Sequence, residues 1–383
     1  MKKKIAILGS TGSIGKNLIN ILKNDKKSFE IILLTADRNY KELIKQARFF
    51  NVKNLVITNK DSYVELKKKN YNNKINIYNN FNSIDKIFKN KIDYTMSAIS
   101  GLEGLSPLLK IIKYTNVIAI ANKEAIICGW NLIKKKLKEN KTSFIPVDSE
   151  HFSIWYGLKG NRDNIEEIYL TASGGPFFKL PLNKFKKIKP SEALNHPNWK
   201  MGKKISIDSS TMMNKVFEII EAKKIFNIPY SKLKILIHPN SYVHAIIKFN
   251  NGMIKVIVHE TNMKIPIFNT LYQKNQKTFN TKKIDIKKLN FLNFAKVDFK
   301  RFPLVKIMDL LPKKNSLFET VLVSSNDALV NLFLEKKIRY DDISKKLLKI
   351  VTNKDFIKYK YKIPIKIKDI NNLNKYVRFK INS

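Results

Sequence analysis

The first 150 residues alternate between short apolar runs and longer amphipathic segments, and this alternation limits the possible folds more than any other feature. The runs KIAIL (4–8) and EIILLTA (30–36) are typical of buried β-strands, whereas IGKNLINILKN (14–24) has apolar residues at helical spacing. Further apolar runs, SFIPV (143–147) among them, continue the pattern. Such alternation predicts βαβ units and a mostly parallel, Rossmann-like sheet over residues 1–148.

The pattern changes after residue 149. Strand-like runs with hairpin-like connections fill the stretch from about 165 to 260, and a helix is predicted from about 210 to 226. We therefore predict an α/β chain whose N-terminal sheet is followed by a central α+β domain (149–270), a linker (271–302) and a small helical C-terminal domain (303–383). The polar stretch 174–202 is too long for an ordinary loop of a compact domain and is predicted to be a flap.

Composition argues against a nucleic-acid-binding or membrane protein. The net charge is +42, but all except six of the 73 basic residues are lysines, spread along the whole chain. Base readout and phosphate forks favour arginine instead. No run of about 18 uncharged apolar residues is present, and the single cysteine, Cys128, suits a reducing compartment. We expect a cytoplasmic protein with solvated lysines and with no nucleic-acid or membrane partner.

A glycine-rich segment, GSTGSIG (9–15), lies directly between the first predicted strand and the first predicted helix. Glycines at this position let the backbone approach a pyrophosphate, whose charge the helix N-terminus stabilises. The spacing is GxxGxxG instead of the usual GxGxxG. The segment predicts a dinucleotide site; the alternative is a turn in which glycine is needed only for packing.

The second predicted strand ends in TADRNY (35–40), where the adenosine ribose of a bound dinucleotide is expected. Asp37 could bind a free ribose 2′-hydroxyl and favour NAD, while Arg38 could bind a 2′-phosphate and favour NADP. Asn39 can serve either cofactor. The local sequence leaves this choice open.

Two carboxylates follow the strand-like run SFIPV, in the segment PVDSEH (146–151). If this segment is extended, Asp148 and Glu150 point the same way and converge. Carboxylates held close together repel unless they share a cation or a proton. Their oxygens suit Mg²⁺ or Mn²⁺, and zinc is disfavoured because no HxxxH or CxxC spacing accompanies His151. The alternative is a strand end with solvated acids.

A third ligand is predicted from the helix at 210–226. Asn214, Lys215 and Glu218 are neighbours on one of its faces. The preceding residues Ser209–Thr211 are of the types that cap helix N-termini, which makes this end of the helix a good anion site. A buried Glu218 beside it would complete the metal site. The alternative for Lys215 and Glu218 is an ordinary surface ion pair.

Three further segments carry candidate site residues. Ser173 and two glycines end a predicted strand and suit the close approach of an anion. His196, Trp199 and Met201 lie in the long polar stretch, where an exposed tryptophan is costly unless it covers something; the alternative is that Trp199 fills a core. The remaining candidates, Asn122, Lys123 and Glu124, follow a strand of the N-terminal sheet, at the end where ligands bind in open α/β folds.

The motifs GSTGSIG, ANKE, VDSEH, SGGPF, HPNWKMG and DSSTMMNK..E occur in this order. Their combination closely resembles the 1-deoxy-D-xylulose 5-phosphate reductoisomerase family, with a match from residue 3 to about 260 and a weaker one beyond. The resemblance implies a homodimeric enzyme. It also implies that NADPH and Mg²⁺ or Mn²⁺ support the conversion of 1-deoxy-D-xylulose 5-phosphate into 2-C-methyl-D-erythritol 4-phosphate, in the non-mevalonate route to isoprenoid precursors.

The resemblance also implies a role for each matching residue. The metal ligands are Asp148, Glu150 and Glu218. The substrate-binding residues are Lys123, Ser149, Glu150, Ser173, His196, Ser209, Asn214, Lys215 and Glu218, of which Lys123, Glu150 and His196 are the catalytic candidates. The flap residues are Trp199 and Met201. The cofactor-binding residues are Thr11, Gly12, Ser13, Ile14, Arg38, Asn39, Asn122, Glu124 and Gly202.

The chain departs from the family pattern at several positions. Asp37 stands where glycine is usual, Asp327 where glutamate is usual, and the segment G-x-PDMR-x-PI is HETNMKIPI (259–267), with His259, Asn262 and Lys264 as replacements. Three other functions are alternatives to the activity that the resemblance implies. They are another metal-assisted NAD(P) oxidoreductase of sugar phosphates, a metal-dependent phosphohydrolase and a nucleic-acid-binding protein.

The opposing charges of Asp37 and Arg38 predict a narrow cofactor preference. An aspartate repels a 2′-phosphate, whereas arginine attracts it and can bind it through two hydrogen bonds. NADPH is expected to be preferred over NADH, with Asp37→Gly widening the preference and Arg38→Ala reducing or reversing it. The ratio of kcat/KM for the two cofactors in the three proteins checks this. A wild type that favours NADH, or an unchanged ratio in Asp37→Gly, would show that this segment does not lie at the adenosine ribose.

Overall fold

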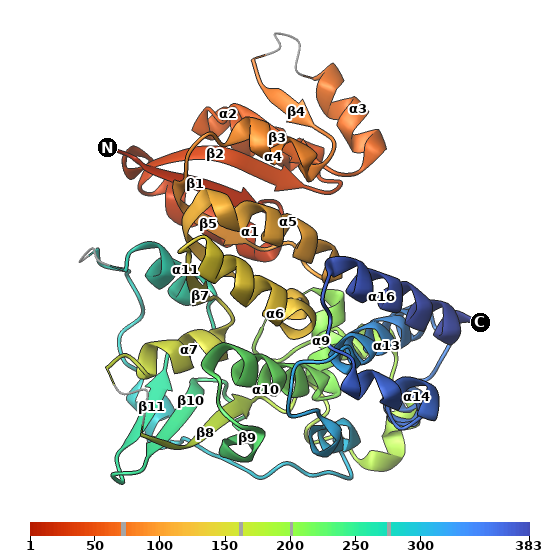
Figure 1. Cartoon of the computed structure of the whole chain (residues 1–383). Helices are drawn as coiled ribbons and strands as arrows, with labels where there is room; N and C mark the ends of the chain where they lie inside the picture. The colour runs from red at the N-terminus through yellow and green to blue at the C-terminus, as the bar shows by residue number, and fades with distance from the viewer. Residues whose placement is uncertain (70–73, 161–163, 200–201, 274–276) are drawn as a thin grey trace. The chain divides into compact units, whose positions relative to one another are not determined.

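The computed structural model describes the chain except residues 70–73, 161–163, 200–201 and 274–276. Its contacts divide the chain into two compact units (Figure 1). The first unit consists of Met1–Ala125, Leu132–Asp148 and Met263–Asn280, and the second of Ile126–Asn131, Ser149–Asn262 and Thr281–Ser383. Each unit has its own β-sheet.

The first unit is built on a seven-stranded sheet in the order β4-β3-β2-β1-β5-β6-β7. All of its strand pairs are parallel. The strands are β1 (Lys3–Leu8), β2 (Phe29–Ala36), β3 (Asn54–Ile57), β4 (Asn76–Tyr78), β5 (Ile92–Ser97), β6 (Thr115–Ile120) and β7 (Ser143–Pro146). The predicted Rossmann-like sheet is confirmed. Its strand order reverses between β1 and β5, which is where ligands bind in open α/β sheets.

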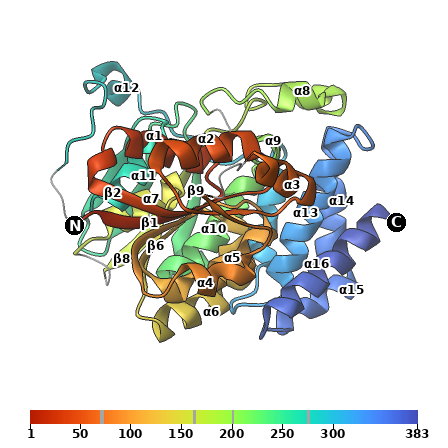
Figure 2. The ribbon, with the colours of Figure 1, turned by 90° about the horizontal axis from the view of Figure 1, so that it is seen from above.

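Helices cover both faces of this sheet, with α1 and α2 on one face and α4 and α5 on the other (Figure 2). The helices of this unit are α1 (Ser13–Lys23), α2 (Tyr40–Phe50), α3 (Lys60–Lys68), α4 (Ile84–Ile87), α5 (Leu105–Ile111), α11 (Lys264–Leu271) and most of α6 (Lys123–Glu139). Ile5 and Ile7 of β1, Leu18 and Leu22 of α1 and Ile267 of α11 are buried in one apolar core. Burial on both faces explains why the strands read as nearly continuous apolar runs.

The second unit has a mixed four-stranded sheet in the order β11-β10-β8-β9. Its strands are β8 (Ile165–Ala172), β9 (Leu233–Ile237), β10 (Val243–Phe249) and β11 (Ile254–Val258). The β10 strand pairs antiparallel with β8 and β11, whereas β8 and β9 are parallel. Helices α7 (Ser149–Gly157) and α10 (Met213–Phe226) pack on this sheet (Figure 1). The central α+β arrangement is as predicted.

The rest of the second unit is mainly helical. Its helices include α8 (Pro190–Ala193), α9 (Lys203–Ser210), α12 (Ile286–Asn290), α13 (Phe318–Leu334), α14 (Tyr340–Val351), α15 (Lys354–Ile357) and α16 (Ile367–Asn382). Helix α13 packs against both α14 and α16, which confirms the predicted helical C-terminal region. The Asp327 carboxylate of α13 accepts a hydrogen bond from the Arg378 guanidinium at 2.8 Å and lies 3.0 Å from the Lys204 Nζ of α9. No helix among the described residues is both long enough and apolar enough to span a membrane.

Two local predictions were wrong. The helix expected from about 210 to 226 is α10, which begins at Met213, but Ser209–Thr211 do not cap it, because Met212 has a φ of 62° and separates α10 from α9. The N-cap of α10 is therefore Met212 and provides no side-chain hydrogen bond, so Ser209 and Ser210 belong to the last turn of α9. The segment after β7 is not extended either, since α7 begins at Ser149.

Candidate active site

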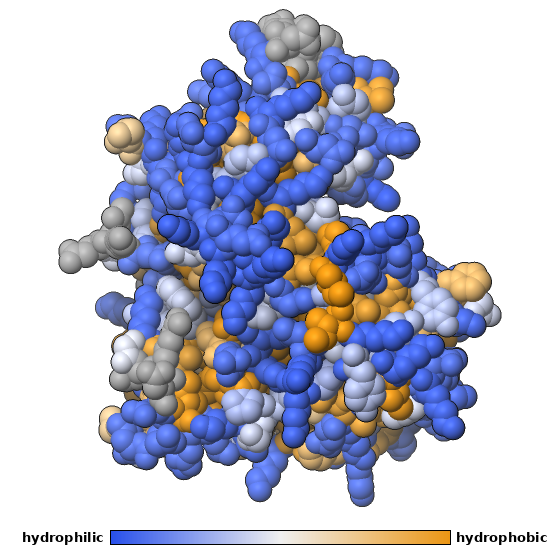
Figure 3. All heavy atoms as spheres, in the orientation of Figure 1, coloured by the Kyte–Doolittle hydropathy of each residue, from blue (hydrophilic) through white to orange (hydrophobic). Residues whose placement is uncertain are grey.

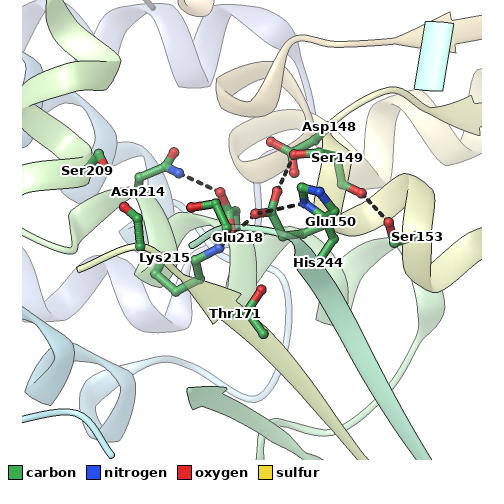
Figure 4. Close-up of polar contacts among 12 residues, drawn as sticks. Asp148, Ser149, Glu150, Ser153, Thr171, Ser209, Asn214, Lys215, Glu218 and His244 are labelled. Atoms are coloured by element: carbon green, nitrogen blue, oxygen red, sulfur yellow. Dashed lines mark hydrogen bonds and ion pairs between the residues drawn. The ribbon is translucent and has the colours of Figure 1, made fainter. Parts of the chain in front are cut away.

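Two carboxylates of the second unit, one buried and one partly buried, meet around one lysine (Figure 4). Glu150 lies in the first turn of α7 and Glu218 lies on α10. The Lys215 Nζ is 3.3 Å from Glu150 Oε1 and also forms an ion pair with Glu218. The Glu218 and Lys215 side chains are only 2% and 5% exposed, so their charges are almost fully removed from water. The alternative of a surface ion pair is therefore wrong.

The Glu150 and Glu218 carboxylates have further polar neighbours. The Ser149 hydroxyl donates to Glu150 Oε2 at 2.6 Å, and the Asn214 amide donates to Glu218. The His244 Nδ1 is 3.9 Å from Glu150 Oε1 (Figure 4). Ser149, Asn214 and Lys215, all predicted from the sequence, thus surround the two acids.

Asp148 is covalently joined to α7 and ends the first unit. One carboxylate oxygen from each of Asp148, Glu150 and Glu218 lies within 4.8 Å of the other two. The predicted pairing of Asp148 with Glu150 is therefore correct, although helix α7 and not an extended segment produces it. Lys123, at the start of α6, places its Nζ 3.2 Å from Asp148 Oδ2. Three carboxylate oxygens at this spacing form the type of donor set that Mg²⁺ and Mn²⁺ prefer.

Sequence reasoning set His151 aside and missed Glu221 and His244 in this region. His151 is fully buried and contacts Glu221 of α10, with 3.5 Å between Nδ1 and Oε2. Its Nε2 donates to the Glu218 carbonyl at 2.9 Å and so ties α7 to α10. The other residue is His244, whose Nδ1 lies 3.9 Å from Glu150 Oε1. Glu221 follows Glu218 by three positions, a helical spacing that could have indicated a shared face, whereas no local signal pointed to His244.

A second polar cluster joins three predicted substrate-binding residues of the second unit. His196 Nε2 lies 3.1 Å from the Ser173 hydroxyl, which follows β8, and 3.1 Å from the Ser209 hydroxyl of α9. The backbone N–H groups of Asn198 and Trp199 both donate to His196 Nδ1, at 3.2 and 3.0 Å. Because Nδ1 accepts two hydrogen bonds, the proton of the neutral ring is on Nε2. Burial lowers the pKa of His196 to about 4, so the ring is a neutral donor at physiological pH.

In the glycine loop of the first unit, two glycines have no room for a side chain and the third does. Gly9 has a φ of 83°, and a side chain there would lie 2.7 Å from the Ala98 carbonyl. A Cβ on Gly15 would lie 2.3 Å from the Gly9 carbonyl, so α1 packs directly on the loop. Gly12 is exposed, and a Cβ there would meet only the Gly9 carbonyl, at 3.4 Å. Packing therefore explains Gly9 and Gly15, while Gly12 leaves open backbone at the N-terminus of α1.

The segment after β2 is exposed, and its two charged residues, Asp37 and Arg38, form an ion pair with each other. The Arg38 Nε is 3.4 Å from Asp37 Oδ2, and Thr58 donates to Asp37 Oδ1 at 2.7 Å. The Asn39 side chain caps α2 by accepting from the Glu42 N–H at 3.1 Å. Asp37 therefore already has two polar partners, which compete with any ribose hydroxyl for its carboxylate.

The other predicted cofactor and flap residues lie as follows. Asn122 is buried and caps α6, accepting from the Ala125 N–H at 2.8 Å and donating to the Gly101 carbonyl at 2.8 Å. Glu124 lies in the first turn of α6, and Gly202 is the exposed N-cap of α9.

Trp199, a predicted flap residue, is partly buried, and its ring centroid lies 6.2 Å from that of His244 in an edge-on arrangement. Met201 falls outside the described residues. The remaining predicted cofactor-binding residues lie at or just before the start of α1; they are Thr11, Ser13 and Ile14.

A parallel sheet with a glycine loop at its point of strand-order reversal, in a chain that also carries a cluster of three partly or fully buried carboxylates, is typical of a metal-assisted, nucleotide-dependent enzyme. Models of the 1-deoxy-D-xylulose 5-phosphate reductoisomerase family match residues 5–129 and 144–226, and a model of the DXP reductoisomerase C-terminal domain matches residues 259–380. The chain belongs to the 1-deoxy-D-xylulose 5-phosphate reductoisomerase family. This confirms the resemblance and the predicted activity, the rearrangement and reduction of 1-deoxy-D-xylulose 5-phosphate to 2-C-methyl-D-erythritol 4-phosphate.

Individual relatives and solved structures belong to the same family and cover most or all of this chain. The 1-deoxy-D-xylulose 5-phosphate reductoisomerase of Pelagibacter ubique is 59% identical over 384 residues, which covers 100% of this chain and 99% of the relative. That of Wolbachia pipientis wMel is 40% identical over 88% of this chain and 87% of the relative. The Zymomonas mobilis reductoisomerase in complex with NADPH has a TM-score of 0.88 at 31% identity, covering 99% of this chain and 98% of the other. A DOX-P reductoisomerase in complex with NADPH, fosmidomycin and magnesium has a TM-score of 0.91 at 28% identity, covering 99% and 97%.

The half-buried, neutral His196 predicts a pH dependence of stability. Its pKa is about 4 in the folded protein against an ordinary 6.5, so between these pH values the unfolded chain binds a proton that the folded chain does not. The free energy of unfolding should therefore fall as the pH drops from 6.5 to 4, by less than a fully buried histidine would give because solvent screens this partly exposed ring. Denaturant unfolding of wild type and His196→Asn over this range measures the contribution as the difference between the two curves. Parallel curves would contradict the assignment.

Proposed function

We propose that Asp148, Glu150 and Glu218 hold the divalent cation with which this chain carries out the reaction of its family. The spacing of their three oxygens within 4.8 Å is the observation on which this rests. Magnesium in the related DOX-P reductoisomerase structure supports the choice of a hard cation. When bound, Mg²⁺ or Mn²⁺ would supply a Lewis acid that stabilises negative charge on the carbonyl and hydroxyl oxygens of the substrate.

The Lys215 ammonium has two roles in this proposal. It balances the charge of Glu150 and Glu218, and it belongs to the set of groups proposed to bind the substrate. The set around the phosphate consists of Ser173, Ser209, Asn214 and Lys215, with His196 as a neutral donor beside the two serines. Binding of the phosphate, which does not react, supplies binding energy that orients the reacting carbons. Ser149, hydrogen-bonded to Glu150, is proposed to contact the substrate near the cation.

Proton movement is assigned to Lys123 and Glu150. A carbon–carbon bond of the substrate breaks and re-forms, which gives a branched aldehyde, and a hydride then reduces the aldehyde. The Lys123 ammonium lies 3.2 Å from Asp148 and is 10% exposed, so a proton donor is held at the edge of the carboxylate cluster. His196 accepts two backbone hydrogen bonds at Nδ1, so we assign it to binding and orientation of the substrate rather than to proton transfer.

The hydride donor is proposed to be NADPH, as in the related reductoisomerase structures that contain it. The N-terminus of α1, next to the exposed Gly12, offers backbone N–H groups to its pyrophosphate. Arg38 is 81% exposed and is available to a 2′-phosphate. Trp199, and Met201 outside the described residues, are proposed to belong to the flap that excludes water.

We also propose a functional division of the chain. Residues 1–148 bind NADPH, residues 149–270 carry catalysis and dimerisation with the flap at 174–202, residues 271–302 form the linker and residues 303–383 form the helical C-terminal domain. Cys128 is buried and is the single cysteine of the sequence, so no intrachain disulfide can form, which supports a reducing, cytoplasmic location.

A homodimer is supported by the apolar edge of the second unit's sheet. β11 is an edge strand, and it exposes Ile254 and Val256, which are 55% and 44% accessible. Figure 3 shows apolar side chains gathered in the region where Figure 1 draws β10 and β11. The linker adds exposed apolar side chains, namely Ile284, Ile286, Phe291, Phe294 and Phe299. Uncovered apolar edges of this kind lead to aggregation, so we propose that a second copy of the chain covers them.

The metal assignment predicts that Glu218→Gln loses catalysis but keeps its cofactor. Removal of one of three charged ligands should lower kcat by more than about a hundredfold, since loss even of groups that only support metal ligands costs about 10–100-fold. NADPH binding, measured by fluorescence titration, should not change. Glu319→Gln is the matched control, because Glu319 is equally buried and pairs with Lys224 of α10, outside the carboxylate cluster. Normal turnover in Glu218→Gln would contradict the assignment.

The dimer predicts that a charged β11 edge dissociates the protein. The variant Ile254→Lys/Val256→Lys should shift the mass in sedimentation equilibrium from that of two chains to that of one. Val64→Lys, which changes a 50% exposed apolar side chain on α3, should leave the mass unchanged. A monomeric wild type, or a double variant that remains dimeric, would show that this edge is not the interface.

A further inference from the structure

The last turn of α9, which carries Ser209, is held by residues of the helical C-terminal region. Ser209 is partly exposed, whereas its two chain neighbours, Asp208 and Ser210, are buried. The Asn326 amide of α13 donates a hydrogen bond to Asp208 Oδ1 at 2.7 Å. The hydroxyl of Tyr340, the first residue of α14, donates to the Ser210 carbonyl at 2.8 Å. Both neighbours of Ser209 are therefore held by helices that lie far away in the sequence.

The Tyr340 hydroxyl serves a carbonyl at the end of α9. The last carbonyls of a helix have no N–H partner within that helix. The Ser209 carbonyl accepts from the Met212 N–H at 3.2 Å, and the chain then turns at Met212, whose φ is 62°. The Ser210 carbonyl accepts from Tyr340 instead, and the same hydroxyl lies 3.2 Å from the Ser210 Oγ. Loss of this donor would remove the partner of a buried carbonyl and allow the turn to move.

The Tyr340 ring also contacts the loop that follows β8. Phe177 of this loop meets the Tyr340 ring edge-on, with the two centroids 5.2 Å apart. Gly175 of the same loop has a φ of 68° and packs on α9 so closely that a Cβ there would lie 2.9 Å from the Ser210 Cα. The loop begins at Ser173, which is proposed above to bind the phosphate. The position of Ser210 therefore sets how the loop with Ser173 packs on the last turn of α9.

We propose that Tyr340 is a positioning residue for the substrate phosphate: its hydroxyl holds the last turn of α9 so that the Ser209 hydroxyl lies where it can bind the phosphate. This inference rests on the proposed function of Ser209. The hydroxyls of Ser173 and Ser209 each lie 3.1 Å from His196 Nε2, so the two serines converge on one place. Tyr340 bonds to Ser210 and not to these hydroxyls, so its effect passes through the backbone of α9.

The test removes the Tyr340 hydroxyl and keeps the ring. Tyr340→Phe deletes one hydrogen-bond donor without opening a cavity, so the variant should fold. The probe is inorganic phosphate, used as an inhibitor that competes with the substrate at saturating NADPH and a fixed free Mg²⁺ concentration. Its inhibition constant should rise about tenfold in Ser209→Ala, as expected for one hydrogen bond to a charged group. In Tyr340→Phe, where Ser209 is displaced but present, the rise should be about fivefold. The KM for NADPH should not change in either variant.

A double variant and a matched control separate positioning from general packing. If Tyr340 acts through Ser209, adding Tyr340→Phe to Ser209→Ala should raise the inhibition constant by less than about twofold, whereas independent effects would multiply. Tyr94→Phe is the control, because it also removes a buried tyrosine hydroxyl, one that pairs with the Thr270 hydroxyl at 2.8 Å in the first unit. It should lower Tm and leave phosphate inhibition unchanged.

The outcomes distinguish this inference from the proposed phosphate site. An unchanged inhibition constant in Tyr340→Phe, or effects that multiply in the double variant, would overturn the inference and leave the role of Ser209 intact. A similar loss of phosphate inhibition in Tyr94→Phe would also overturn it, because general destabilisation would then explain the effect. An unchanged constant in Ser209→Ala, or a wild type that phosphate does not inhibit, would overturn the phosphate site itself.

Discussion

Like charges buried side by side are the constraint on which the rest of the second unit depends. Glu150 and Glu218 are held close together and largely out of water, which is unfavourable unless a cation is shared. Lys215 supplies one positive charge to both. Because α7 carries the first acid and α10 the second, these helices must pack in one register, and His151 fixes it through the Glu218 carbonyl. A divalent cation among the same oxygens would add to the charge balance that Lys215 begins.

The surrounding structure brings distant segments to this cluster. The mixed sheet supports α7 and α10 on one face, and the β-bulge at His244 directs a strand residue to Glu150. His196 joins the end of β8 to α9 through two serines, so a loop residue organises a binding site made by two other elements. In the first unit, the tight packing of Gly9 and Gly15 forms the turn, and Gly12 leaves the backbone open to a ligand.

The sequence predicted those features whose causes are local. Apolar runs and their spacing predicted both sheets, and the scarcity of acids made the Asp148–Glu150 pair conspicuous. The prediction of their geometry was wrong, because a strand-like run does not show that a helix starts at Ser149. The break at Met212 was missed because a positive φ at a non-glycine residue depends on tertiary packing. His244 and Glu221 were missed since their partners are far away in the sequence or face each other only after α7 and α10 pack.

The most direct test of the assigned activity is the oxidation of NADPH by purified protein in the presence of 1-deoxy-D-xylulose 5-phosphate. Absorbance at the nicotinamide band should fall only when the substrate and Mg²⁺ or Mn²⁺ are both present. The loss should stop on addition of a chelator and resume when excess cation is restored. Oxidation that continues in metal-free protein, or the absence of any oxidation with the complete mixture, would contradict the central role of the carboxylate cluster.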